Sequence, residues 1–315
     1  QIDKSRFEWI GSDSARREGI SRPSTTFWKD AIGRLMKNKV AVVCFFIIVL
    51  LILSCIIVPF FSPFESREQH LGEVNKGFMT VCTDSRYEGQ HHVHYFGTDN
   101  LGRDLFLRAF EGGRVSLMIA FAAVFVNLIV GLIYGGISGY IGGAVDTIMM
   151  RIVEIVNGIP YLIVVILLMM VLPKGIFTMV VAYGITGWTG MARLVRGQVL
   201  QLKSQEYIVA AEAMGAKSSR IIAKHLIPNA LSVIIINVTL AIPSAIFTEA
   251  FLSYIGLGVP VPQPSWGVLA KGGQDVFMTY PYQLVVPAVA ISLTMLSFNL
   301  LGDGLRDAFD PRLRR

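Results

Sequence analysis

The chain has 315 residues, of which 53% are hydrophobic and 16% are charged, and its mean hydropathy is +0.57. Soluble globular domains carry about 25% charged residues, so this composition excludes an ordinary soluble protein and indicates an integral membrane protein. The net charge of +6 would also suit a nucleic-acid-binding protein. However, the basic residues are concentrated between particular apolar stretches, a distribution that a membrane topology explains.

The polar segment 1–39 contains the sequence STTFWKDAIGRLMKNK just before the first apolar stretch. Helical spacing places its apolar residues on one face and its basic residues around the other, which predicts an interfacial helix over about 24–37. A simple basic juxtamembrane tail is the alternative. No cleavable signal pattern is present, so we expect the first apolar stretch to remain in the membrane as an anchor.

Six uncharged stretches can each supply the roughly 20 residues that a bilayer-spanning helix needs. They are 40–61, 115–145, 155–173, 176–192, 230–248 and 276–302. We therefore predict an all-α integral membrane protein with six transmembrane helices. The alternative is a soluble protein in which one or two of the stretches are buried core helices.

The basic residues predict the orientation of these helices. Of the 28 Lys and Arg residues, 20 lie in 1–39, at Arg151, in 193–229 and in 303–315. The positive-inside rule makes these segments cytoplasmic, so both termini are expected inside.

The same alternation divides the chain into segments. We expect an extracytoplasmic loop at 62–114 and a five-helix core at 115–302. Within the core we expect a cytoplasmic loop at 200–229 and an extracytoplasmic loop at 249–283, followed by a cytoplasmic tail at 303–315.

Glycines repeat every four residues within the second stretch and predict a smooth packing face. In a membrane, small residues let helices approach closely. We therefore assign Gly131, Gly135 and Gly139 to helix packing, whereas Gly142 and Gly143 are interpreted as a helix end.

Ionisable residues are absent from the middle of every predicted span. This argues against an ion-driven secondary transporter and against an intramembrane protease, both of which need such groups. The three cysteines imply no disulfide framework, because Cys44 and Cys55 are about 16 Å apart along one predicted helix and Cys82 is alone in a loop.

The stretch AAEAMGAKSSRIIAKHLIPN at 210–229 predicts two short helices on the cytoplasmic side. Ser204 is a candidate cap for the first helix, and Gly215 a left-handed residue that ends it. Ser218 or Ser219 is expected to cap the second helix, which Pro228 would stop before the next span. An ordinary connecting loop is the alternative.

The spacing of small residues in this stretch resembles the EAA loop of ABC importer permeases. The motifs YFGTDNLGRD, RIIAKHLIPN, YIGLGVPVPQPSWG and NLLGDGLRDAFDPR resemble, more narrowly, the C-type permease subunit of oligopeptide and dipeptide importers, over about residues 27–315. One departure is Val209, which stands where the family pattern has Glu.

This resemblance implies the six-helix fold of a type I importer permease and a set of partners. The partners are a second permease, two ATPase subunits, an extracytoplasmic binding protein, a peptide substrate and membrane lipid, but no nucleic acid. The implied ATPase-coupling residues are Tyr207, Ala210, Ala211, Gly215, Ala216, Ser218, Arg220, His225 and Pro228. A related importer for nickel or another small solute, and a non-transporting scaffold that recruits an ATPase, are the alternatives.

No G-x-x-x-x-G-K-[ST] phosphate loop occurs in the sequence. We therefore expect that the chain is not an enzyme and binds no cofactor itself. By resemblance, ATP and Mg²⁺ are held by the partner ATPase subunits. The location implied for the whole complex is the bacterial cytoplasmic membrane.

The extracytoplasmic loops carry a second motif, which the resemblance places toward the external binding protein. Its residues are Gly97, Thr98, Asp99, Gly102, Arg103 and Asp104. In the later loop, Ser265 is expected to cap a short helix.

The first extracytoplasmic loop also contains four histidines and a cysteine, a combination that can form a metal site. They are His70, His91, His92, His94 and Cys82. Because neighbouring histidines in a solvated loop are usually polar surface, we expect no metal site here.

Overall fold

The computed structural model describes residues 27–83 and 92–310. Its helices are α1 (Phe27–Lys37), α2 (Lys39–Phe61), η2 (Leu71–Glu73), α3 (Leu105–Ile141), α4 (Gly143–Asn157), α5 (Tyr161–Val171), α6 (Ile176–Thr186), α7 (Trp188–Lys203), α8 (Glu206–Ala213), α9 (Ser218–Ile221), η4 (Ile222–Leu226), α10 (Ile227–Tyr254), α11 (Trp266–Asp275) and α12 (Tyr282–Phe309). The strands β1 (Thr80–Val81) and β2 (Val93–His94) pair antiparallel. The predicted helical fold is thus confirmed, with this one small sheet added in the described residues.

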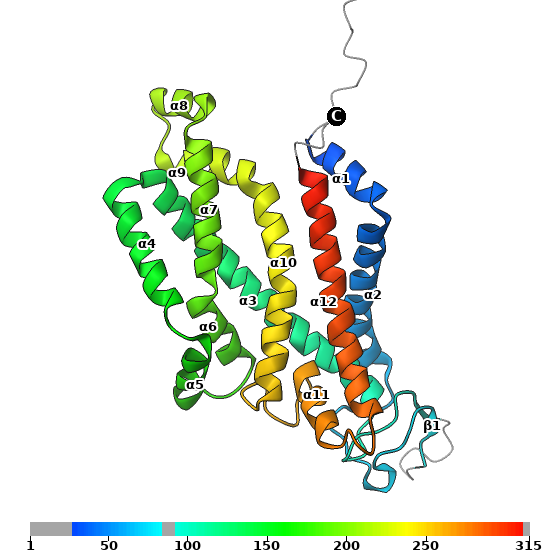
Figure 1. The fold of residues 1–315 in the computed structure, drawn as a ribbon. Coiled ribbons are helices and arrows are strands. Elements are labelled where there is room, and N and C mark those ends of the chain that lie inside the picture. Colours follow the sequence, from blue (N-terminus) through cyan, green and yellow to red (C-terminus); the bar gives the residue numbers. More distant parts are fainter. Residues whose placement is uncertain (1–26, 84–91, 311–315) are drawn as a thin grey trace, which may run out of the picture.

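The long helices run between two ends of the molecule (Figure 1). One end, called here the α8 end, holds α1, α8 and the last turn of α12; the other, called the α11 end, holds α11 and the loop with the two strands. Helix α3 crosses the bundle obliquely and contacts α2, α10 and α7. The chain therefore presents two separate surfaces, one at each end of a helical bundle.

Four helical stretches are long and apolar enough to cross a membrane, namely α2, α3, the continuous stretch Ser218–Tyr254 and α12. Helices α4 and α5 supply a fifth if they count as one span bent by 77°. The remaining predicted span, 176–192, is divided between the 11-residue α6 and the start of α7. By length and composition, the described residues thus support four to five of the six predicted crossings.

Two predicted spans are interrupted where the backbone chemistry demands it. The stretch 115–145 does not stay helical throughout, because α3 ends at Ile141 and both Gly142 and Gly143 have positive φ, as expected for a helix end. The stretch 155–173 breaks ahead of Pro160, since the residue before a proline is disfavoured in the helical region.

Other helices extend beyond the predicted spans. Helix α3 begins at Leu105 instead of 115, so the preceding loop is 62–104. Helix α10 continues to Tyr254, and α12 runs from Tyr282 to Phe309, which makes most of the predicted tail helical. Hydrophobicity alone misplaced these ends because polar residues continue a helix once its neighbours support it.

The prediction that Pro228 stops a short helix is wrong. Helices α9, η4 and α10 follow one another without a break, and Pro228 lies in the first turn of α10. The π-helical turn η4 (Ile222–Leu226) precedes it, and a first-turn proline loses no required N–H bond. The segment before the membrane is therefore joined rigidly to a long spanning helix.

The largest core cluster lies where α2, α3, α10 and α12 meet, and α11 closes it from one side. Trp266, at the start of α11, is fully buried there, and its indole Nε1–H donates to the carbonyl of Ala109 at 2.9 Å. As predicted, Ser265 caps α11: its hydroxyl accepts from the Val268 N–H at 3.2 Å. The cluster thus ties α11 to four long helices.

Helices α3 and α7 approach so closely that no side chain fits between them along the predicted glycine face. A Cβ built on Gly135 would lie 2.3 Å from the carbonyl oxygen of Ala192, and one on Gly139 would lie 2.9 Å from that of Arg196. Gly131 likewise faces a side chain of α7. We call this contact the α3–α7 seam.

An ion pair closes the seam at the α8 end. The Arg196 guanidinium donates to both carboxylate oxygens of Asp146 at 2.5 Å, and the Ser138 hydroxyl donates to the same carboxylate at 2.5 Å. Such bidentate pairs fix orientation as well as distance. Helices α3, α4 and α7 are therefore held as one unit where α7 leaves the bundle.

Helix α1 forms as predicted from Phe27, while residues 24–26 of the predicted helix lie outside the described residues. Ala31 is buried, and Leu35 packs on the core beneath it. Trp28 contacts the ring of Phe309 edge-on, with centroids 5.8 Å apart. Because α1 contacts the last turn of α12, these two parts of the chain lie at the same end of the bundle.

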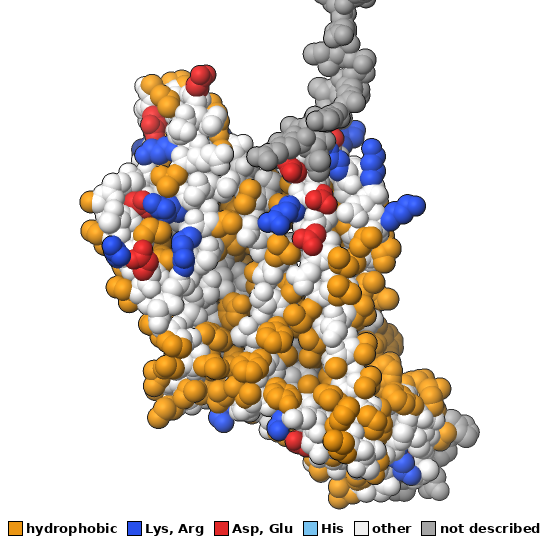
Figure 2. All heavy atoms as spheres, viewed as in Figure 1, with side chains coloured by type: hydrophobic (Ala, Val, Ile, Leu, Met, Phe, Trp, Pro, Cys, Tyr) orange, Lys and Arg blue, Asp and Glu red, His pale blue; other side chains and the backbone are white. Residues whose placement is uncertain are grey.

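Charge and apolar surface are distributed as a membrane protein requires (Figure 2). In this view, Lys, Arg, Asp and Glu side chains gather toward the α8 end, while apolar side chains cover the middle and lower part of the bundle. Large apolar residues are exposed along α2, α3, α5 and α12. Surfaces of this kind are stable against lipid or against another membrane subunit.

We expect Gly135→Ala to destabilise the chain by about 1–3 kcal/mol, because the added methyl group meets the α7 backbone. The check is the thermal unfolding midpoint of the purified protein in detergent. Gly136→Ala is the matched control, since a Cβ there meets only Ile222 Cγ2 at 3.5 Å, an ordinary contact. Equal midpoints for the two variants would contradict the seam.

Candidate functional site

Residues 204–228, called here the α8–α9 segment, project beyond the bundle at the α8 end (Figure 1). The predicted caps are wrong in detail. Gln205 occupies the N-cap of α8 without a side-chain bond, while the Ser204 hydroxyl donates back to the carbonyl of Gln201 at 3.1 Å. Lys217, not a serine, is the N-cap of α9. The two helices therefore owe little to serine capping.

The turn between the two helices is fixed by its backbone. Gly215 has φ +78°, its N–H donates to the carbonyl of Glu212 at 2.9 Å, and the Ala216 N–H donates to that of Ala211 at 3.1 Å. This pair of bonds is the Schellman motif, which needs a left-handed residue at the position of Gly215. A glycine adopts that conformation without steric cost, so the prediction for Gly215 agrees with the structure.

The base of the segment is anchored in a small apolar core. Ile208, Ile221 and Leu226 are fully buried against Val195 and Val199 of α7. This shared core therefore packs the segment directly against α7.

Polar contacts add to this anchoring. The Tyr140 hydroxyl donates to Glu212 at 3.0 Å, and Lys203 Nζ donates to the Tyr140 carbonyl at 2.5 Å. Asn229 Nδ2 donates to the His225 carbonyl at 2.6 Å and lies 3.3 Å from the Tyr207 hydroxyl. The end of α3 and the start of α10 are thus both tied to the segment.

The predicted coupling residues divide by exposure. Six of them are exposed, two are half-buried, and one is buried inside the segment. The exposed residues are Tyr207, Ala210, Gly215, Ser218, Arg220 and Pro228. The half-buried residues are Ala216 and His225, and the buried residue is Ala211.

The tip of the α8–α9 segment also carries exposed apolar side chains. Met214 is 82% exposed, Val209 is 54% exposed and Tyr207 is 44% exposed. Val209 occupies the position at which the EAA pattern has a carboxylate, so this chain presents an apolar group there. An apolar tip surrounded by Glu and Lys side chains has the character of a protein contact surface.

At the opposite end, residues 62–83 and 92–104 form what we call the loop module. All six residues of its predicted motif are buried within this chain. Asp99 Oδ1 accepts from the N–H groups of Leu101 and Arg103 at 2.9 Å, and its Oδ2 accepts from Arg103 Nε at 2.7 Å. The donors and acceptors of these side chains are used to fold the loop, and the orientation of the segment toward an external protein stays a prediction.

Neighbouring motif residues fix the loop and dock it on α12. Gly102 has φ +74°, and a Cβ there would lie 1.9 Å from the carbonyl of His70, so only glycine fits. Thr98 accepts from the Lys76 N–H at 2.8 Å. Gln283 of α12 donates to the Thr98 carbonyl at 3.2 Å.

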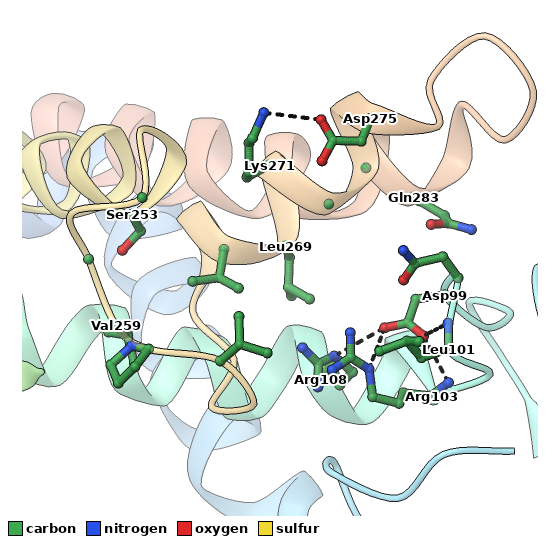
Figure 3. Close-up of a pocket in the computed structure, with 18 of the residues that line it drawn as sticks. Asp99, Leu101, Arg103, Arg108, Ser253, Val259, Leu269, Lys271, Asp275 and Gln283 are labelled. Atoms are coloured by element: carbon green, nitrogen blue, oxygen red, sulfur yellow. Dashed lines mark hydrogen bonds and ion pairs between the residues drawn. The ribbon is translucent and has the colours of Figure 1, made fainter. Parts of the chain in front are cut away.

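A pocket of about 500 Å³ lies between the loop module and α11 (Figure 3). Asp99, Arg103 and Arg108 are linked on one wall, and the Lys271–Asp275 pair stands on α11 opposite them. Apolar side chains lie between the two charged groups. The pocket therefore offers both signs of charge around an apolar floor.

The sequence predicted that the histidines of the loop module are polar surface residues, but two of them are buried. His70 and His94 are buried, and His91 lies outside the described residues. His94 Nδ1 is 2.8 Å from Asp104 Oδ1, and its Nε2 is 3.2 Å from Glu73 Oε2.

The pKa values of His94 and Glu73 are shifted in opposite directions. Burial alone lowers the pKa of His94, but hydrogen bonds to Asp104 and Glu73 and their charges outweigh it and raise this pKa. Burial alone raises the pKa of Glu73, yet hydrogen bonds from Thr83, Cys82 and His94 leave it lower than usual. A buried region rich in negative charge therefore surrounds His94.

Sequence reasoning missed one buried carboxylate. Because α10 reaches Tyr254, Glu249 lies inside this helix, only 1% exposed, and accepts from the Ser253 hydroxyl at 2.8 Å. Glu249 lies one residue beyond the predicted span 230–248 and near the end of α10, so the prediction that no ionisable group occupies the middle of a span is not contradicted by it. The signal available in the sequence was the glycine at position 256, which has a positive φ and follows the real end of the helix.

Comparison with known families identifies the fold. The family described as "Binding-protein-dependent transport system inner membrane component" matches residues 127–315, and the "N-terminal TM domain of oligopeptide transport permease C" matches residues 26–77. Among solved structures, one titled as inward facing conformations of the MetNI methionine ABC transporter matches with a TM-score of 0.51. It covers 64% of this chain and 94% of that chain at 20% identity, so it shows the shared fold alone.

Relatives along the whole chain narrow the family. The oligopeptide transport system permease protein OppC of Bacillus subtilis is 49% identical over 100% of this chain and 99% of its own length. The dipeptide transport system permease protein DppC of Bacillus subtilis is 48% identical over 95% of this chain and 90% of its own length. OppC of Escherichia coli K12 is 42% identical over 99% of this chain and 99% of its own length. The chain therefore belongs to the inner membrane components of binding-protein-dependent transport systems, within the oligopeptide and dipeptide permease branch.

Proposed function

We propose that the chain is the transmembrane subunit of an ATP-driven peptide importer and forms half of the translocation pathway with a second, homologous permease. Membership of the oligopeptide and dipeptide permease branch supports the substrate class. The observation that carries the mechanism is the rigid α8–α9 segment, which presents an apolar tip and continues into α7 and α10.

In this proposal the α8–α9 segment docks on an ATPase subunit. The exposed residues of its tip make the contact, while the buried Ile208 and Ala211 transmit the movement to α7. Since α7 is locked on α3 at the α3–α7 seam, closure of the ATPases would rock both helices together. The apolar Val209 makes the contact less dependent on charge than the family pattern implies.

Hydrolysis of ATP is assigned to two partner subunits, which hold the ATP and Mg²⁺. The absence of a phosphate loop from the sequence supports this assignment. This chain then supplies no catalytic group and acts as the driven component.

The remaining partners follow from the exposed surfaces. Large apolar residues on the outward faces of α2 and α5 suit contact with lipid or with the second permease. At the α11 end, exposed apolar residues of the loop module and of the segment after α11 suit an extracytoplasmic binding protein. They are Leu71, Phe78, Met79, Tyr95 and Met278.

The orientation in this proposal places the α8 end in the cytoplasm of a bacterial cell and both termini inside. The concentration of Lys and Arg in 1–39, 193–229 and 303–315 supports it. The gathering of Lys and Arg side chains, together with Asp and Glu, toward the α8 end is a further support for this proposal (Figure 2).

The function is tested by reconstituting the chain in liposomes with its partner permease, ATPases and binding protein. We expect ATP-dependent uptake of a labelled short peptide, and no uptake when the binding protein is omitted. Uptake of Ni²⁺ without peptide would instead indicate a related solute importer. Assembly that binds ATPase but moves no solute would indicate a scaffold and contradict the proposal.

A second prediction concerns the turn of the α8–α9 segment. Gly215→Val is expected to strain the left-handed turn by about 1–2 kcal/mol, although the site has open space for the side chain. The expected result is ATP hydrolysis that continues while peptide uptake per ATP falls several-fold, with normal insertion into the membrane. Uptake and hydrolysis are measured in the same proteoliposomes.

Gly215→Asn is the matched control, because asparagine tolerates the left-handed conformation far better than a β-branched residue. It should keep most of the coupling. An unchanged ratio of uptake to hydrolysis in Gly215→Val would count against this geometry for the turn.

A further inference from the structure

Three groups that bind metals converge inside the loop module, away from the α8–α9 segment. One ligand atom each of Glu73, Cys82 and His94 lies within 4.8 Å of the others. The three residues are 2%, 8% and 0% exposed, respectively. They come from three separate pieces of the loop, namely η2, the residue after β1, and β2.

Two of the three separations between the ligand atoms are close to those of a tetrahedral metal site. Cys82 Sγ and His94 Nε2 each lie 3.2 Å from Glu73 Oε2. Zinc bonds of about 2.0–2.3 Å at tetrahedral angles place such ligand atoms about 3.3–3.6 Å apart. The two contacts to Glu73 Oε2 would therefore lengthen by only a few tenths of an ångström around an ion, and Cys82 Sγ and His94 Nε2 lie within 4.8 Å of each other.

The imidazole is already oriented as a metal ligand. Asp104 Oδ1 lies 2.8 Å from His94 Nδ1, which leaves Nε2 directed at Glu73 and Cys82. Ligating histidines commonly donate their other ring N–H to a carboxylate, which fixes the ring and its tautomer. Asp104 is itself fixed, because its Oδ2 caps α3 by accepting from the Leu107 N–H at 2.7 Å.

The carboxylate of Glu73 is also held in position, in this case by Thr83. Glu73 Oε1 accepts from the backbone N–H and the hydroxyl of Thr83, and this leaves Oε2 for the other two ligands. Two buried carboxylates, Glu73 and Asp104, together with a thiol surround one histidine. A bound divalent cation would offset this excess of negative charge.

We propose that Glu73, Cys82 and His94 bind one Zn²⁺ ion, with Asp104 orienting the histidine. A thiolate and an imidazole favour Zn²⁺ over Mg²⁺ and Ca²⁺, which prefer oxygen ligands alone. Three protein ligands leave one tetrahedral position for water. The site is independent of the proposed transport function and needs no partner subunit.

The ion would stabilise the loop module by joining η2, β1, β2 and the start of α3. The same residues hold the motif in place, since the Thr98 hydroxyl donates to the Glu73 carbonyl. Removing the metal would therefore loosen the loop that frames the pocket beside Asp99.

The test uses the full-length chain in detergent, purified with a tag that contains no histidine, incubated with Zn²⁺ and freed of unbound metal. We expect about one zinc ion per chain by mass spectrometry of the metal, and loss of that zinc in Cys82→Ser. Cys44→Ser is the matched control, because Cys44 is a buried free cysteine in α2, far along the chain from the site. It should retain the zinc.

Asp104→Asn tests the orienting role without removing the helix cap, since asparagine caps as well as aspartate. Competition with a chelator should show zinc affinity reduced about 10–100-fold. Co²⁺ added to the unmodified chain should give a thiolate-to-metal charge-transfer band, a readout that needs no variant.

Stoichiometric zinc that depends on Cys82, together with the cobalt–thiolate band, supports the site. Absence of zinc from the unmodified chain, equal zinc in Cys82→Ser, or bound cobalt without the band would overturn it. In that case the three groups form a hydrogen-bond network only.

Discussion

The close approach of α3 and α7 is the constraint on which the rest of the structure depends. Gly135 brings the two backbones so near that the α7 carbonyl of Ala192 occupies the space of a side chain. Lipid supplies no hydrophobic force to press helices together, so packing of this kind must hold them. The Asp146–Arg196 pair then fixes α7 at the point where it leaves the bundle.

Because α7 is held in this way, the short helices that follow it have a firm base. Their turn is set by two backbone bonds around Gly215, and their inner face is buried in a core shared with α7 and α10. A push on the tip is therefore passed to two long helices instead of being absorbed in a flexible loop. In the proposed function, this is the physical means by which the chain would respond to a separate ATPase subunit.

The loop module at the other end is stabilised by different chemistry. It has little apolar core of its own, and buried polar groups such as Asp99, Arg103 and His94 satisfy one another there. Buried polar groups are costly unless every partner is in place, so these contacts hold the described parts of the loop in the observed arrangement. A metal ion at Glu73, Cys82 and His94 would strengthen the same network.

The sequence by itself determined the features that depend on local chemistry. Apolar length predicted membrane helices, the glycine spacing predicted a packing face, and Gly215 and Ser265 predicted a turn and a cap, because each rests on neighbouring residues. Only the tertiary structure decided which helix covers the glycines, that α10 extends to include the buried Glu249, and that His94 meets Cys82 and Glu73. These contacts join residues far apart in the chain, and their energy exists only once the folded backbone has brought the groups together.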